Sequence, residues 1–463
     1  MFSTSPLDWG IIAAYLGLLL VFWWRSRSAS TSADDYLVAG RGVTLPAFVA
    51  TLVATWYGGI LAVGEYGWRY GLANWLVFGV PYYVGAALFA LLFAKRARES
   101  ALTSLPDQLE RAYGRGPALA GAALIFVQTA PAAYVLMLGT LIAVMTGAPL
   151  VPSVLIGAVL SVFYVDKGGL RSVVSADRFQ AALMFGGFAM LLAFVFAKHG
   201  GLSFLIGRVP ATHFEWHGGQ GAAAILVWYV IALGTLVEPA FWQRCYAARD
   251  ARTARTGVLL SIGGWALFDL MTMTAALYAR ALLPDLADPV MAFPELARQV
   301  LPPLALGFFF VGMTATVMST IDSYTFVAAT TLARDLAWRV RGGDPSRVPQ
   351  WSRWALWATT AFATALALSH RSVIDLWKDV GSIVTPALLV PVLLAVYARR
   401  RLPSPAALLL LIAPAAISLA WTLARNANSG ALPPLGLEPI YAGIGTSLVL
   451  ALILSPLSRE IPS

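Results

Sequence analysis

Apolar stretches of about 20 residues recur along almost the whole chain, with no polar domain between them. A helix of that length is what the hydrocarbon core of a bilayer requires. The chain of 463 residues is 59% hydrophobic and 12% charged, whereas soluble domains are about a quarter charged. The sequence therefore predicts an all-α polytopic membrane protein with about thirteen transmembrane helices.

The predicted spans form a leading helix, two sets of five and two closing helices. The leading helix covers 7–24, and the closing helices cover 406–423 and 439–454. The first set covers 44–67, 75–94, 118–146, 151–165 and 173–198, and the second covers 221–242, 256–278, 303–332, 354–369 and 373–398. Because five is odd, the two sets enter the membrane from opposite sides, which is the pattern of an inverted repeat.

This division predicts five regions along the chain. They are a leading helix with an inner loop (1–43), repeat one (44–198), an outer loop (199–220), repeat two (221–398), and two additional helices with the C-terminus (399–463).

The charge distribution predicts an orientation rather than a nucleic-acid partner. The net charge of +9 comes from residues spread over short loops, not gathered in one patch. If the N-terminus lies outside, the inner loops hold most of the Lys and Arg, in accord with the positive-inside rule. We expect an integral protein of the plasma (inner) membrane with a cytoplasmic C-terminus. The single cysteine, Cys245, excludes a disulfide framework, and no obligate protein partner is evident.

Two of the predicted spans contain helix breakers at matching places. The glycine pair of 54–59 (ATWYGG) interrupts the first span of one set, and Gly234 with Glu238-Pro239 interrupts the first span of the other. Such paired interruptions point to a transport site near the bilayer midplane. The opened carbonyls are then free to bind a cation where the backbone lines a cavity. Close helix packing through small residues is the alternative.

A row of hydroxyls lies in the predicted span 303–332. Thr316, Ser319, Thr320 and Ser323 have the spacing i, i+3, i+4, i+7 and share one helical face. Hard cations prefer oxygen ligands, and this face offers several without a full charge. Alternatively, these side chains bond the carbonyls one turn earlier in their own helix. Asp322 favours the ion site, because an intramembrane carboxylate usually marks an ion or proton pathway.

Asp177 is a second acid near the start of a predicted span. A salt bridge with Arg171 or Arg178 at the membrane surface would explain it structurally. If Asp177 approaches Asp322 instead, the two carboxylates need a cation or a shared proton between them.

An acid among aromatic residues suggests where a solute binds. Glu238 lies at the second break, one turn from Trp242, and Trp56 and Tyr57 come from the opposing broken helix. This combination favours a cationic group through charge and cation–π attraction, although ordinary aromatic packing is an alternative. The predicted substrate-contacting residues are Trp56, Tyr57, Gly58, Glu65, Glu238 and Trp242.

At these residues the sequence resembles the sodium:solute symporter family. The matching stretches are 36–41, 105–109 with Tyr113-Gly114, 168–173 with Asp177 and Gln180, Gln243-Arg244, and 318–323 with Arg334-Asp335. They occur in the family's order and cover nearly the whole chain. The resemblance implies a leucine-transporter-like fold of five plus five inverted helices, and uptake of a small solute with sodium.

The resemblance also implies ion ligands. A shared sodium site would use carbonyls of Ala54 and Tyr57 with the side chains of Thr316, Ser319 and Thr320. Some members bind another sodium at positions that match Asp177, Ser319, Asp322 and Ser323, so one or two sodium ions are expected. The stretch 54–59 is similar to the choline-transporting branch, and Trp56 matches one of its tryptophans. Glu238 replaces another, which suggests a different amine or a zwitterion.

These observations predict sodium-coupled symport of a small polar organic solute by alternating access, with an amine, zwitterion or other cation-bearing solute favoured. A proton-coupled carrier on the same fold and a transporter-like sensor acting through a partner protein are the alternatives. An enzyme is not expected, because the sequence offers no nucleophile, acid–base or transition-metal cluster.

Overall fold

The computed structural model describes residues 5–26, 32–163, 168–342, 344–369, 373–427 and 437–460. These residues are almost entirely helical. The helices of the first half are α1 (Pro6–Ser26), α2 (Ala33–Val38), α3 (Leu45–Trp56), α4 (Ile60–Tyr70), α5 (Val80–Phe89), α6 (Lys95–Glu99), α7 (Leu105–Tyr113), α8 (Arg115–Thr129), α9 (Ala132–Thr146), α10 (Leu150–Phe163) and α11 (Gly169–His199). Two π-helical turns, Trp75–Gly79 and Ala90–Ala94, make α5 and α6 parts of one helix over Trp75–Glu99.

The second half continues in the same way. Its helices are α12 (Ala222–Ile231), α13 (Pro239–Ala247), α14 (Ala251–Leu282), α15 (Ala292–Val300), α16 (Ala305–Thr330), α17 (Arg339–Arg341), α18 (Val348–Ser369), α19 (Val373–Tyr397), α20 (Ser404–Ala427) and α21 (Pro439–Leu454). A two-residue antiparallel pair, β1 (Arg400–Arg401) with β2 (Arg459–Glu460), joins the ends of α19 and α21.

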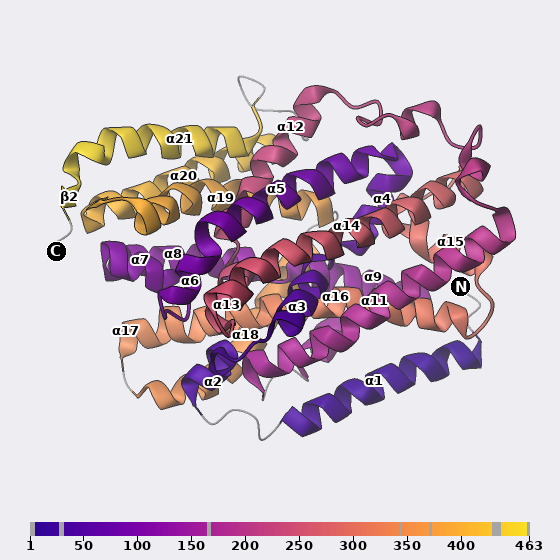
Figure 1. Ribbon diagram of the computed structural model, residues 1–463, viewed down its shortest axis with the longest axis horizontal. Helices are drawn as coiled ribbons and strands as arrows, with labels where there is room; N and C mark the ends of the chain where they lie inside the picture. The colour runs from indigo at the N-terminus through magenta and orange to yellow at the C-terminus, as the bar shows by residue number, and fades with distance from the viewer. Residues whose placement is uncertain are drawn as a thin grey trace.

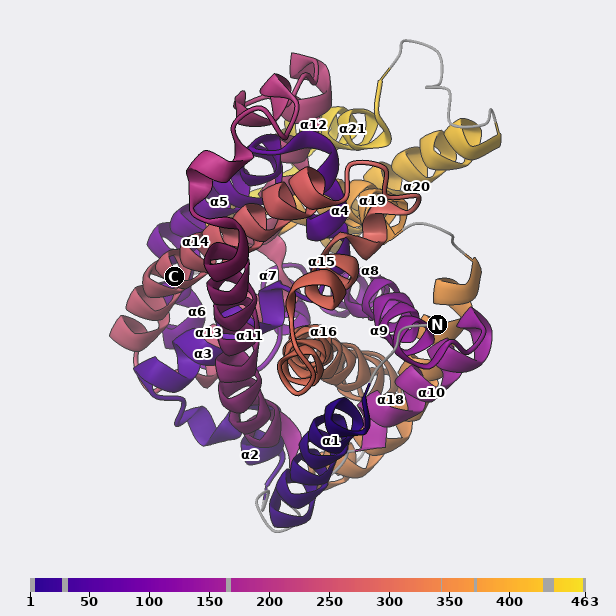
Figure 2. The ribbon, with the colours of Figure 1, turned by 90° about the vertical axis from the view of Figure 1, so that its right-hand side faces the viewer.

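Most helices run along the long axis of the molecule, as Figure 1 shows. The end-on view of Figure 2 places α16 in the middle of the bundle. In the span that contains α16, 83% of the most apolar window is buried, against 22% for the span of α21. A helix can hide that much surface only when protein surrounds it, so α16 is the central helix against which other elements are positioned.

Nine helices among the described residues are long and apolar enough to cross a membrane, and the bent pair α3–α4 makes a tenth. The count of thirteen stays a prediction, because it also requires α1, α10 and α18 to cross. The 14 residues of α10 rise only about 21 Å, short of a hydrocarbon core of about 30 Å.

The first predicted break is present between α3 and α4. The helix ends at Trp56 and resumes at Ile60, and the two axes differ by 62°. The glycines at this break, Gly58 and Gly59, allow neighbouring side chains to pack directly against the backbone. A Cβ on Gly58 would lie 2.5 Å from Cβ of Thr320, and one on Gly59 would lie 1.8 Å from the Trp377 ring. Helix interruption and close packing, which the sequence offered as alternatives, therefore occur together.

The second predicted break is present between α12 and α13. A 3₁₀ turn over Ala232–Val237 follows α12, and Pro239 begins α13. Glu238 is extended (φ −69°, ψ 112°), because a residue before proline is disfavoured in the helical region. Its carboxylate accepts a hydrogen bond from the Ala240 N–H at 3.4 Å, so the acid also caps the new helix.

A cluster of charged residues connects α7 to the helical residues that follow α16, up to Arg341. Asp107 accepts hydrogen bonds from Arg334 at 2.7 Å and from Arg339 at 2.8 Å. Burial alone would raise the pKa of Asp107, but the two guanidinium groups outweigh it and hold that pKa at about 2. This cluster lies at the same end of the molecule as α6 and β2 (Figure 1).

Candidate functional site

The hydroxyl row of α16 meets the C-terminal end of α3. Ser319 Oγ donates to the carbonyl oxygen of Ala54 at 2.9 Å, and Thr320 Oγ1 donates to that of Thr55 at 2.8 Å. Both side chains are completely buried. The structure thus brings together carbonyls and hydroxyls that are 265 residues apart in the sequence.

The other two predicted sodium ligands lie differently. The Thr316 hydroxyl donates to the Gly312 carbonyl one turn earlier, at 2.8 Å. This is the bond within the same helix that the sequence left open as the alternative to ion binding. Tyr57 is the first residue after α3, and its phenol donates to the Trp265 carbonyl at 2.8 Å. The oxygens of Ala54, Thr55, Ser319 and Thr320 are neutral and hard, which fits a small monovalent cation better than a transition metal.

A second buried polar cluster lies one turn away along α3 and α16. Asp177 of α11 accepts a hydrogen bond from Thr51 and lies 3.8 Å from Arg244 of α13. The Arg244 guanidinium donates to Ser323 at 2.5 Å and to Thr55 at 3.2 Å. Asp177, predicted from the sequence to pair at the membrane surface or to bind a cation, therefore faces Arg244 in the interior.

Asp322 is also completely buried on α16. On the same helix, Met318 Sδ accepts a hydrogen bond at 3.8 Å from the hydroxyl of Tyr15 of α1, which itself accepts one from Gln180 at 3.2 Å.

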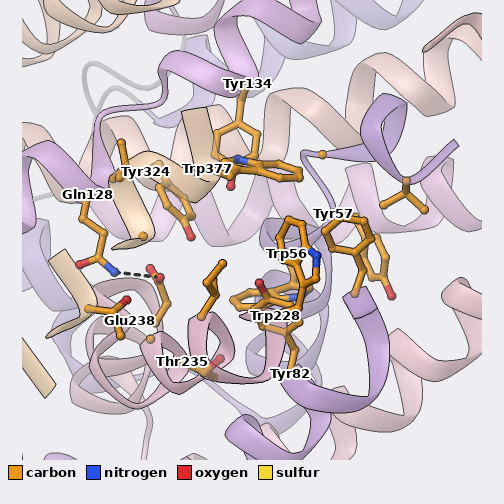
Figure 3. A pocket seen from close by; sticks show the side chains of 18 of the residues that line it. Trp56, Tyr57, Tyr82, Gln128, Tyr134, Trp228, Thr235, Glu238, Tyr324 and Trp377 are labelled. Carbon is orange, nitrogen blue, oxygen red and sulfur yellow. Dashed lines mark hydrogen bonds between the residues drawn. The ribbon is translucent and has the colours of Figure 1, made fainter. Parts of the chain in front are cut away.

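A cavity of about 190 Å³ lies between the two helix breaks. Eight aromatic residues line it, namely Trp56, Tyr57, Phe78, Tyr82, Tyr134, Trp228, Tyr324 and Trp377. Figure 3 shows Trp377 and Tyr134 on one side, Trp228 and Tyr82 on the opposite side, and Glu238 with Gln128 at one end. Trp56 and Tyr57 line this cavity and are the next two residues after Ala54 and Thr55, whose carbonyls face α16.

The charged residues on this wall are both acids. Among the described residues that line the cavity, Glu238 and Asp269 are the acids, and Lys, Arg and His do not occur. Glu238 accepts a long hydrogen bond from Gln128 at 3.4 Å, whereas the Asp269 carboxylate is bonded by the Tyr83 phenol. The cavity therefore combines acidic side chains with aromatic faces, a combination that suits cationic groups.

The predicted substrate contacts separate into two groups. Trp56, Tyr57 and Glu238 line the cavity. Gly58 is not among the lining residues, but a Cβ on it would lie 2.6 Å from the ring of the lining residue Tyr134. Glu65 instead forms an ion pair with Arg69 at 3.0 Å on α4. Trp242 is packed in the interior, where its indole donates to the Leu236 carbonyl at 3.1 Å.

Several residues of the site were not singled out by the sequence. Tyr324 follows Thr320 by one helical turn, so the hydroxyl row could have indicated it. Gln128, Tyr134, Trp228 and Trp377 come from α8, α9, α12 and α19, and ordinary apolar or helical sequence surrounds each of them. Their convergence depends on how distant helices pack.

The fold and this site define a polytopic helical membrane protein whose interrupted helices surround a central cavity, the architecture of a secondary transporter. The sodium:solute symporter family model matches residues 36–413. The chain belongs to the sodium:solute symporter family.

Characterised relatives cover most of the chain. It is 28% identical to the high affinity choline transporter 1 of Homo sapiens, over 79% of this chain and 68% of that protein. It is 26% identical to the sodium/pantothenate symporter of Escherichia coli, over 71% of this chain and 72% of that protein. It is 25% identical to the osmoregulated proline transporter of Bacillus subtilis, over 96% of this chain and 94% of that protein.

Among solved structures, an outward-open Na⁺-coupled sialic acid symporter matches with a TM-score of 0.81 at 15% identity, over 99% of this chain and 100% of that chain. This likeness establishes the fold.

Proposed function

We propose that this chain carries out sodium-coupled symport of a small, cation-bearing organic solute by alternating access. The observation that carries the proposal is the contact between the α16 hydroxyls and the carbonyls at the end of α3, directly beside the cavity. Both parts of that contact must separate or rearrange if α3 moves relative to α16. An ion that binds there can therefore favour one arrangement of the two helices over the other.

The sodium ligands that we propose are the carbonyls of Ala54 and Tyr57 and the hydroxyls of Ser319, Thr320 and Thr316. Support comes from the burial of these oxygens and from the close approach that Gly58 permits between the α3–α4 break and Thr320. The membrane potential contributes about 2.3 kcal/mol for each charge moved through 100 mV, to which the sodium gradient adds.

For the solute we propose contacts with Trp56, Tyr57, Gly58 and Glu238 in the cavity between the breaks, with Tyr134, Tyr324 and Trp377 as further wall residues. The two acidic side chains and the absence of a basic side chain among the described lining residues favour a cation-bearing solute, such as an amine or a zwitterion, over an anion. Names of the relatives include a choline transporter, a pantothenate symporter and a proline transporter, so relatedness alone leaves the solute open.

The inverted repeat and the orientation are also part of the proposal. Each set of five predicted spans begins with an interrupted helix, α3–α4 in one and α12–α13 in the other. The first residues of α1 and the last of α21 lie at opposite ends of the long axis (Figure 1), as an odd number of crossings requires. The basic helices α6 and α17 lie at the same end of the molecule as β2 (Figure 1), and the basic strand β1 pairs with β2. This arrangement supports a cytoplasmic C-terminus and an outer N-terminus.

A proton-coupled carrier is the less favoured function. The oxygens where α3 meets α16, from Ala54, Thr55, Ser319 and Thr320, are carbonyls and hydroxyls, which are neutral and do not titrate. A sensor that acts through a partner protein has no specific support in the structure.

Thermal unfolding of the purified protein tests the proposal directly. We expect the apparent Tm to rise with sodium but not with potassium at equal ionic strength, because a specific ligand of the folded state stabilises it. In saturating sodium, a panel of quaternary amines, primary amines, amino acids, sugars and carboxylates should reveal a further rise for a cation-bearing member. Equal Tm values in sodium and potassium, with uptake that tracks pH, would establish the proton-coupled alternative instead.

A further inference from the structure

A hollow of about 440 Å³ lies where α6 packs against the first turns of α14. Basic side chains from both helices line it, Lys95 of α6 with Arg252 and Arg255 of α14, and Leu259 lies beside them. The hollow shares no residue with the central cavity. Because no Asp or Glu occurs among the described residues that line it, the hollow suits an anion.

The acids nearest in sequence already have partners. Glu99 pairs with Lys95 at 3.8 Å, one turn along α6. Asp250 pairs with Arg249 at 3.2 Å, and its other carboxylate oxygen accepts the Thr253 N–H at 2.7 Å. Since Asp250 thereby caps α14, the start of that helix is occupied, and an anion in the hollow is bound by side chains instead.

The two arginines of the hollow are exposed on one face of α14. The side chains of Arg252 and Arg255 make no ion pair or hydrogen bond with any residue in the described part of the chain. Arg98 of α6, by contrast, donates to the Ala248 carbonyl ahead of α14. The hollow therefore holds positive charge that the protein does not compensate.

The same face of α14 continues as apolar surface. Leu259, Gly263, Leu267 and Leu270 follow Arg255 at spacings of three or four residues. The three leucines are 38%, 53% and 56% exposed, and no described atom lies within 4 Å of a Cβ built on Gly263. From Arg255 to Leu270 this apolar stripe rises about 22 Å, more than half of a hydrocarbon core of about 30 Å. Basic residues at the start of a membrane span, followed by an exposed apolar stripe, complement a charged headgroup and its acyl chains.

We propose that the hollow binds the phosphate headgroup of an anionic phospholipid, whose acyl chains lie along the apolar stripe. Arg252 and Arg255 donate charge-assisted hydrogen bonds to the phosphate oxygens, and Lys95 adds positive charge from α6. Basic pockets between membrane helices recognise anionic headgroups by this chemistry. Because α6 and α14 belong to different predicted sets of five spans, one lipid connects the two sets. Inorganic phosphate offers the same oxygens but nothing for the apolar stripe.

Thermal unfolding in detergent micelles tests the lipid site. We expect the apparent Tm to rise when phosphatidylglycerol is added to the micelles. Phosphatidylcholine, whose headgroup has no net charge, and inorganic phosphate at equal ionic strength should not raise it. In Arg252→Gln/Arg255→Gln, the phosphatidylglycerol concentration at half-maximal stabilisation should rise about a hundredfold, since each charge-assisted hydrogen bond contributes about tenfold to affinity.

Arg341→Gln/Arg347→Gln is the matched control. It removes two exposed arginines between α16 and α18, at the same end of the molecule as α6 but outside the hollow. This control should respond to phosphatidylglycerol as the natural chain does. An equal loss of response in the control and the test variant would show diffuse surface attraction and overturn the site. Stabilisation by inorganic phosphate equal to that by phosphatidylglycerol would overturn the lipid assignment.

Native mass spectrometry provides a readout that does not depend on stability. The natural chain and the control should retain one phosphatidylglycerol molecule under conditions that release phosphatidylcholine, and Arg252→Gln/Arg255→Gln should retain none. Retention of the lipid by that variant would contradict the proposal. Neither measurement requires sodium or a solute, so a failure here leaves the proposed transport function untouched.

Discussion

The hydroxyl of Ser319 donates a hydrogen bond to the carbonyl oxygen of Ala54 at 2.9 Å, across 265 residues of sequence. Ala54 lies in the last turn of α3, where the helix is about to break, and Ser319 lies on the central helix α16. The bond thus connects an interrupted helix to the most buried of the candidate membrane spans among the described residues. Movement of α3 against α16 must change this contact, which makes it a suitable place for an ion to control conformation.

Removal of either hydroxyl at this junction should weaken the sodium response. We expect Ser319→Ala or Thr320→Ala to raise the sodium concentration at half-maximal stabilisation by about tenfold or more, since one lost polar contact to an ion is worth about 1–3 kcal/mol. A sodium titration of the apparent Tm measures this. Thr330→Ala is the matched control, because the Thr330 hydroxyl bonds carbonyls of its own helix. Normal sodium titrations in both junction variants would refute the site.

The glycines at the first break should not tolerate a methyl group. Gly59→Ala would place Cβ 1.8 Å from the Trp377 ring, and Gly58→Ala would place it 2.5 Å from Thr320. We expect each variant to lose about 1–3 kcal/mol of stability through overpacking. Gly263→Ala on α14 is the control, because nothing lies within 4 Å of its added Cβ. Stabilities measured by denaturant unfolding that match this control would contradict the close approach.

The charge of Glu238 should select the solute. Glu238→Gln preserves shape and removes the negative charge, so the affinity for the cation-bearing solute should fall about tenfold or more while sodium stabilisation persists. The measurement is a solute titration of Tm in saturating sodium. Glu65→Gln provides the comparison, because the ion pair of Glu65 with Arg69 holds it elsewhere. A larger loss of affinity in Glu65→Gln than in Glu238→Gln would place the solute elsewhere.

The cluster at α7 should make stability depend on acidic pH. The pKa of Asp107 is about 2 in the folded protein, below its ordinary value of 3.8. The unfolded chain therefore binds the proton more readily between these values. The resulting stabilisation, about 2 kcal/mol, is complete above pH 4 and is lost as pH falls from about 4 to about 2.

Asp107→Asn should be less stable at pH 6, and its stability should decline less between pH 4 and pH 2 than that of the natural chain. Parallel pH profiles of the two proteins, measured by thermal unfolding, would show that the Arg334 and Arg339 contacts do not stabilise the carboxylate.

The sequence alone was sufficient for the class of fold and for the location of the breaks. Stretches such as 173–198 can only be buried in lipid or protein, and Gly58-Gly59 and Glu238-Pro239 disfavour a continuous helix by their own backbone chemistry. The family motifs 36–41 and 318–323 are short stretches that can be recognised from the sequence alone. The match of the family model over residues 36–413 confirms the family assignment. The thirteen crossings, the repeat and the ion ligands stay predictions.

The tertiary structure decided which side chains share a site. Sequence spacing placed Trp242 one turn from Glu238 and left Arg244 as part of a motif, whereas packing buries Trp242 against the Leu236 carbonyl and directs Arg244 at Asp177. Residues such as Gln128 and Trp377 reach the cavity from helices far away in the chain. Helical periodicity fixes which residues share a face of one helix, but the rotation and depth of each helix against its neighbours depend on all its contacts together. Local sequence specifies the helices and their breaks, and only their packing specifies the cavity.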